Sequence, residues 1–147
     1  MKKSYILFLA SALALSSAAC SKKNDPTTPT TTVKLSATAN GAQQVPANNS
    51  MATGAFTGTY TDNGTTKQLA YSVTYQGLTP TLAHIHIGAP GAKGAVAIPF
   101  ASLASPITGT VTLTDDQADK LLSNSMYVNI HTSAYQDGEI RGDIKKQ

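Results

Sequence analysis

The three histidines of this chain lie in two short segments that alternate between polar and aliphatic residues. The order is His-Ile-His-Ile over residues 84–87 and Tyr-Val-Asn-Ile-His over residues 127–131. Successive side chains of a β-strand point to opposite faces, so His84 and His86 share one face, and His131 points away from its aliphatic neighbours. Three imidazoles on one face suit Cu(II) or Zn(II), because two ring nitrogens from one strand can reach a common ion. A metal site of this kind would hold copper or another transition metal.

A third segment places charged residues in the same alternation. Residues 139–144 read Glu-Ile-Arg-Gly-Asp-Ile, a pattern that buries the isoleucines and predicts Glu139 and Arg141 on the exposed face. If the three segments share a sheet, Glu139 and Arg141 lie beside the histidines, where they support the metal ligands or pair across strands. Two alternatives stay open. The histidines can be polar outer-face residues without a metal, and the two charges can be an ordinary surface pair.

The remaining polar clusters predict no catalytic residues. The acidic residues Asp115, Asp116 and Asp119 fall in a predicted helix, where a solvated helix start explains them. The glycine-rich stretch 88–94 leads into a strand rather than a helix, so it predicts a tight connection with positive φ and no phosphate cradle. No serine or cysteine lies in a nucleophile elbow. The sequence therefore favours a non-enzymatic protein.

The histidines must be positioned by a chain of short strands. The two-residue period and the flanking Gly, Pro, Asn and Asp residues predict eight strands, at 33–39, 56–61, 69–75, 83–88, 95–100, 108–113, 126–132 and 139–145. Asp62-Asn63-Gly64 predicts a hairpin turn. One short crossover helix is expected after Thr114, which begins a Thr-x-x-Gln capping box. This set of elements predicts an all-β sandwich or barrel.

The first 19 residues have the pattern of a secretory signal. Lys2 and Lys3 precede an uncharged apolar stretch that ends in small residues, and Cys20, the only cysteine, follows directly. Residues 1–20 resemble the signal of a bacterial lipoprotein, which implies lipidation of Cys20. An ordinary secreted protein is the alternative. Residues 20–33 are rich in Thr and Pro and predict an extended tether, which leaves 34–147 as one domain.

Charge excludes one class of function. The whole chain carries a formal charge of +3, but residues 34–147 contain seven basic and seven acidic side chains. The excess of positive charge therefore belongs to the leader and tether, and nucleic acid is not an expected partner. The expected partners are a membrane, through the N-terminal lipid, and an unidentified protein or envelope ligand.

Residues 34–147 resemble a CHRD domain, the module named from chordin. The resemblance rests on Gly-Ala-Gln-Gln-Val-Pro at 41–46, Gly-Leu-Thr at 77–79, Ala-His-Ile-His-Ile-Gly at 83–88, Gly-Ala-Lys-Gly at 91–94, Tyr-Val-Asn-Ile-His-Thr at 127–132 and Gly-Glu-Ile-Arg-Gly at 138–142. Gln44 stands where an acidic residue is common in this family. The resemblance implies an Ig-like or related β-sandwich and does not by itself supply a biochemical activity.

A fainter similarity concerns copper chemistry. Residues 77–86 are similar to the stretch of Cu/Zn superoxide dismutase that supplies two copper ligands from one strand, and His131 and Arg141 match a later histidine and an anion-guiding arginine. The chain has no fourth histidine to bridge two metals, so dismutase activity is not expected. We therefore expect a lipid-anchored, non-enzymatic binding or structural module of the bacterial cell envelope, facing the periplasm or the cell surface. The alternative is a mononuclear copper protein that uses His84, His86 and His131.

Overall fold

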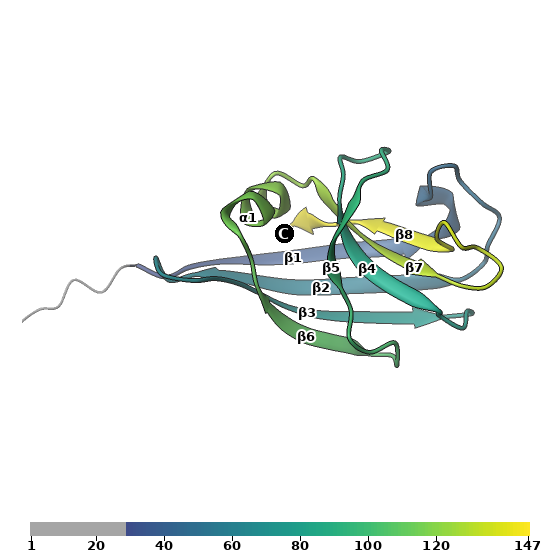
Figure 1. Cartoon of the computed structure of the whole chain (residues 1–147), viewed down its shortest axis with the longest axis horizontal. Coiled ribbons are helices and arrows are strands. Elements are labelled where there is room, and N and C mark those ends of the chain that lie inside the picture. Colours follow the sequence, from purple (N-terminus) through teal and green to yellow (C-terminus); the bar gives the residue numbers. More distant parts are fainter. Residues whose placement is uncertain (1–28) are drawn as a thin grey trace, which may run out of the picture.

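Strands make up most of the chain from Thr31 onward. The computed structural model describes residues 29–147, so the predicted signal peptide, Cys20 and most of the tether lie outside the described residues. The elements within this range are shown in Figure 1. They are β1 (Thr31–Asn40), η1 (Gly41–Gln43), β2 (Thr53–Asp62), β3 (Lys67–Gln76), β4 (Leu82–Ile87), β5 (Ala95–Pro99), β6 (Ile107–Thr112), α1 (Asp115–Leu122), β7 (Met126–His131), β8 (Ile140–Asp143) and β9 (Lys145–Lys146).

One antiparallel sheet folds over to form both layers of a sandwich. The strand order is β5-β4-β7-β8-β1-β2-β3-β6, with β9 paired to β1. Only one residue pair, Asn40 with Arg141, joins β1 to β8, whereas β1 and β2 pair along their whole length. The sheet can therefore turn at the weak β8–β1 junction, and the strands of the second layer cross over β1, β2 and β3 (Figure 1). The predicted all-β sandwich with one short helix is confirmed.

The core lies between the two layers and is built from alternate residues of each strand. On β4, Ala83 and Ile85 are buried in the core, while His84 and His86 point to the other face. Phe56, Leu69 and Val73 contribute from the facing layer. These apolar core residues fix the pairing register, because a slip of one residue would exchange the core and outer faces of a strand. The histidines are thus held on the outer face of β4.

The predicted helix and its cap are both present. The Thr114 hydroxyl accepts a hydrogen bond from the Gln117 backbone N–H at 3.2 Å, and the Gln117 side-chain oxygen accepts one from the Thr114 N–H at 3.0 Å. This reciprocal pair satisfies two N–H groups that the first turn leaves without partners.

Strand β1 begins at Thr31, two residues before the predicted start. No helix in the range 29–147 has the length and apolar content needed to cross a membrane.

Candidate functional site

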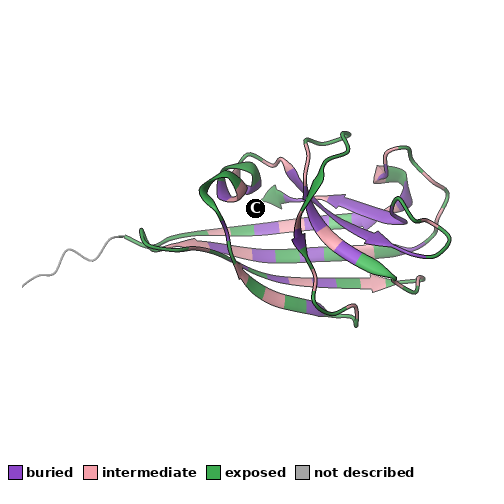
Figure 2. Ribbon diagram, in the orientation of Figure 1, coloured by how far each residue is buried: buried purple, intermediate pink, exposed green. Residues whose placement is uncertain are grey.

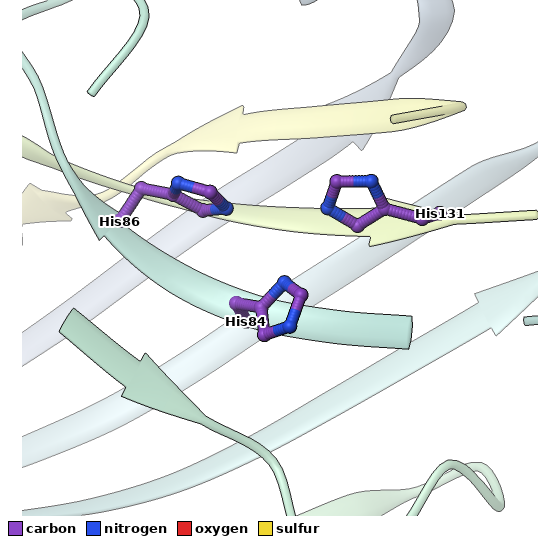
Figure 3. Close-up of side chains that lie close together, drawn as sticks. All are labelled: His84, His86 and His131. Atoms are coloured by element: carbon purple, nitrogen blue, oxygen red, sulfur yellow. The ribbon is translucent and has the colours of Figure 1, made fainter. Parts of the chain in front are cut away.

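Strand register brings the three histidines onto neighbouring strands. On β4 and β7, His84 pairs with Asn129, His86 with Tyr127 and Leu82 with His131. The ring centroids lie 5.6 Å apart for His84 and His86, 5.2 Å for His84 and His131, and 6.2 Å for His86 and His131. Figure 3 shows that each ring turns one nitrogen toward a common centre. The predicted juxtaposition of these histidines is therefore present.

Backbone carbonyls orient two of the three rings. Nδ1 of His86 lies 3.0 Å from the carbonyl oxygen of Gly94, and Nδ1 of His131 lies 2.8 Å from that of Gln136. A carbonyl only accepts, so both Nδ1 atoms carry the proton, and both Nε2 atoms carry a lone pair. Such a partner on the far nitrogen is typical of histidines that bind metals. The Nε2 atoms of His86 and His131 can therefore act as metal ligands.

Two nitrogens of the cluster have no hydrogen-bond partner. Nδ1 of His84 and Nε2 of His86 are both buried and unpaired within residues 29–147. Nε2 of His131 accepts a single bond, at 3.2 Å, from the side-chain amide of Asn129. A buried polar atom without a partner costs about 1–3 kcal/mol, so such atoms in a folded protein require an explanation. Here they are two of the three nitrogens that converge.

Burial favours the neutral form of His84 and His86. It lowers the pKa of His84, and the nearby His131 and His86 lower it further. The pKa of His86 is also lowered, mainly by burial and less by His131 and Arg141, while its bond to Gly94 acts in the opposite direction. A neutral imidazole is the form that binds a metal ion, because protonation would occupy the ligand lone pair.

The spacing of the ligand atoms fits one ion with little movement. One nitrogen of each histidine lies within 4.8 Å of the corresponding nitrogen of the other two. Three nitrogens around one Zn²⁺ or Cu²⁺ ion, with bonds of about 2.1 Å, lie about 3.4–3.6 Å from one another. The ring nitrogens therefore need to approach one another by up to about 1.4 Å. Three imidazoles with room for a further ligand suit copper or zinc.

Arg141 is buried and fixes the loop that orients His86, so the predicted exposure of this residue is wrong. Its exposed fraction is 1%. The guanidinium donates to Asp143 Oδ1 at 2.8 and 3.0 Å and to the carbonyls of Ala92 and Ala89 at 2.7 and 3.1 Å. These carbonyls belong to the loop of residues 88–94, which ends at the carbonyl that holds His86. Arg141 thus supports the site through this loop.

Tyr127 links Arg141 to the histidines directly. The guanidinium carbon of Arg141 lies 3.6 Å from the centroid of the Tyr127 ring. The same ring stacks on His86 with an interplanar angle of 7° and a centroid distance of 4.8 Å. The Tyr127 hydroxyl also accepts a hydrogen bond from the Gly94 N–H at 3.1 Å. The ring of His86 is therefore held by Tyr127 and by the loop beside it.

Glu139 is also buried, with an exposed fraction of 8%, and its carboxylate forms no hydrogen bond with a histidine within residues 29–147. Its carboxylate accepts hydrogen bonds of 2.6 Å from the hydroxyls of Ser50 and Thr132. It forms no ion pair with Arg141, which binds Asp143 instead. The predicted pairing of Glu139 with Arg141 is therefore wrong, and so is the predicted exposure of Glu139.

The outer face of β7 is covered, which the alternation of residues did not indicate. His131 and His86 are each 8% exposed, and every residue of β7 is buried. Figure 2 shows continuous burial along β7 and most of β8. Hydrogen bonds from the loops of residues 41–52, 88–94 and 132–139 close over this face. Alternation assigned the histidines to the correct face, but the cover comes from loops that are distant in sequence.

Two residues beside the histidines, Asn129 and Gln44, have roles that the sequence analysis did not predict. Asn129 contacts His131, and Gln44 in turn donates to Asn129 Oδ1 at 2.6 Å. The signal for Asn129 was present, because it shares the strand phase of His131. Gln44 gave no comparable signal, since its contact spans 85 residues of sequence.

The fold and this cluster define an all-β sandwich protein with a three-histidine site. Comparison with models of known protein families matches the CHRD domain over residues 35–144. The chain therefore belongs to the CHRD family, as the motifs predict. This membership supports, at the level of class, a binding or structural module. No curated protein and no solved structure gives a significant match.

The lowered pKa values of His84 and His86 predict a pH-dependent stability of the metal-free protein. In the unfolded chain both rings have a pKa near 6.5, so protons bind the unfolded state more strongly. The free energy of unfolding should be highest above about pH 6.5 and should fall as the pH is lowered below it. Urea denaturation between pH 7.5 and 5 with a chelator present measures this. A double variant, His84→Gln with His86→Gln, should show a smaller decline, and an equal decline would contradict the assignment.

The role of Arg141 predicts a local effect on the loop of residues 88–94. In Arg141→Lys the planar group that reaches Asp143 and two carbonyls is lost, so unfolding should require about 2 kcal/mol less free energy. Hydrogen exchange at the Gly94 amide should become faster than in the parent protein. Lys145→Arg, a similar exchange of cations on the exposed strand β9, serves as the control. Unchanged exchange at Gly94 in Arg141→Lys would contradict this role.

Proposed function

We propose that this protein is a non-enzymatic metal-binding module, tethered to the bacterial cell envelope by a lipid on Cys20. The observation that carries the metal-binding part is the convergence of three histidine nitrogens, two of them buried without a hydrogen-bond partner. A transition-metal ion is the partner that would satisfy all three. The CHRD fold is compatible with this role, because it presents the histidines on rigid neighbouring strands.

The ligands in this proposal are Nδ1 of His84 and Nε2 of His86 and His131. Copper or zinc, once bound, would supply a strongly polarising cationic centre. The chain contributes the geometry. The carbonyls of Gly94 and Gln136 hold two rings in the required tautomer, and Tyr127 stacks against His86. Burial disfavours protonation of His84 and His86, which would otherwise compete with the metal.

The sequence of the N-terminal segment supports the location at the envelope. Lys2 and Lys3, the apolar stretch and the small residues before Cys20 form the pattern of a lipoprotein signal. Several acyl chains on an N-terminal cysteine would provide a firm membrane anchor without a spanning helix. The Thr- and Pro-rich residues up to Thr31, where β1 begins, would separate the domain from the membrane surface.

Metal titration tests the first part of the proposal. The metal-free protein should take up about one equivalent of Cu(II) or Zn(II), measured by calorimetry and by elemental analysis after gel filtration. Each of His84→Ala, His86→Ala and His131→Ala should weaken binding by at least about a hundredfold, because loss of a ligand exceeds the 10–100-fold effect of a supporting residue. Glu139→Gln is the control and should bind normally, since the Glu139 carboxylate accepts hydrogen bonds from two hydroxyls rather than from a histidine. Uptake that survives all three alanine variants would refute the site.

Fractionation of cells tests the anchor. The parent protein, expressed in a diderm bacterium, should be found in the membrane fraction and should incorporate a labelled fatty acid. Cys20→Ser removes the thiol and should abolish labelling and release the protein from the membrane. Ser21→Ala, directly beside it, should change neither result. Unlabelled parent protein in the soluble fraction would contradict lipid anchoring and leave the histidine site unaffected.

A further inference from the structure

A small chamber lies directly beside two of the histidines. It has a volume of about 190 Å³, and its walls include His86, His131 and Asn129. Sites for drug-sized ligands begin at about 300 Å³, so the chamber is restricted to a smaller molecule. Lys93 and Asp137 also line it and form an exposed ion pair of 3.2 Å. The chamber therefore reaches solvent between the loops that carry these two residues.

Asn129 places a hydrogen-bond donor at the boundary between the chamber and the histidines. It is 3% exposed, and its Oδ1 accepts the bond from Gln44, which turns Nδ2 toward His131. One N–H of Nδ2 points to Nε2 of His131 at 3.2 Å, and the other reaches the carbonyl of Asp137 at 3.4 Å. Gly138, with φ of +121°, leaves space for this amide, because a Cβ there would lie 2.5 Å from it.

Metal binding would remove the acceptor of one Asn129 N–H. The lone pair of Nε2 on His131 is shared with Asn129 in the structure, and the same lone pair must bind the ion. The released N–H would then be a buried donor without an acceptor, which is unfavourable unless another acceptor takes its place. The Gln44 contact prevents the amide from simply turning over. The N–H of Asn129 Nδ2 would then be free to donate a hydrogen bond to a group bound next to the ion.

The charge of the site favours an anion as that group. Within residues 29–147 the ligand cluster consists of three imidazoles and contains no carboxylate. Of the acidic residues near it, Asp137 pairs with Lys93, Asp143 with Arg141, and Glu139 is held by two hydroxyls. A divalent ion would therefore retain its full charge in a buried setting, where a negative ligand is strongly stabilising.

We propose that the chamber is the binding site of a small anion that completes the coordination of the metal and accepts a hydrogen bond from Nδ2 of Asn129. This inference rests on the proposed metal-binding function and adds the class of the fourth ligand. Gln44 is a positioning residue in this arrangement, because it fixes the direction of the Asn129 amide. Entry is between Lys93 and Asp137, and the volume limits the anion to a few heavy atoms.

Azide titration of the Cu(II)-loaded protein tests the inference, with the azide-to-copper charge-transfer absorption as the readout. Asn129→Leu keeps the size of the side chain and removes the donor, so its azide Kd should rise at least about tenfold. Its copper affinity should not fall, because copper no longer displaces the hydrogen bond from Asn129 to His131. A merely structural role would weaken both. Gln76→Leu, an amide exchange on β3 outside the chamber, should change neither constant.

A second variant covers the case in which Asn129→Leu does not fold. Asn129→Asp keeps the acceptor for Gln44 but replaces the donor with a carboxylate oxygen, so it should also lose azide binding. Copper uptake by the parent protein without an azide response would overturn this inference alone, as would an unchanged azide Kd in both Asn129 variants. A parent protein that takes up no copper would overturn the proposed function and this inference together.

Discussion

Strand β7 is buried on both faces, and the need to satisfy its polar side chains shapes the structure around it. Val128 and Ile130 face the core, while Tyr127, Asn129 and His131 lie beneath loops on the other face. Buried polar groups must be hydrogen-bonded or they destabilise the fold. The loops meet this need with the backbone carbonyls of Gln136 and Asp137, the side-chain amide of Gln44 and the backbone N–H of Gly94. The positions of loops 88–94 and 132–139 follow from these contacts, and Arg141 is buried because it completes them.

Two of the three histidine nitrogens that converge are exceptions to this network within residues 29–147. The far nitrogens of His86 and His131 each have a carbonyl partner, whereas Nδ1 of His84 and Nε2 of His86 have none. A cluster that served only stability would gain from pairing these atoms or from replacing them with apolar groups. The retention of unpaired nitrogens in an ordered setting is instead typical of sites in which the ligand provides the missing interaction. This is the physical basis for the proposed metal-binding function.

Different segments of the sequence support separate parts of the proposal. The proposed envelope location depends on the N-terminal leader and Cys20, which lie outside the described residues, while the proposed metal and anion binding depends on β4, β7 and their loops. Membership of the CHRD family covers residues 35–144 and supports the broad class of binding or structural module. The exposed residues Leu82 and Val96 pair with His131 and His86 across the sheet, so the histidine site is near a partly apolar region of β4 and β5.

The sequence by itself determined the elements and the faces of the strands. The two-residue period predicted the strands, Thr114 and Gln117 predicted the capped helix, and Ile85 and Ile130 assigned the histidines to the outer face, because these signals are local in the chain. Only the tertiary structure decided what covers that face. Arg141 and Glu139 were expected in solvent because alternation distinguishes two faces but not whether a loop packs over one of them. The contacts of Arg141 with Ala92 and of Gln44 with Asn129 span 49 and 85 residues of sequence. Contacts between residues so far apart in the chain form only when the whole sheet folds over.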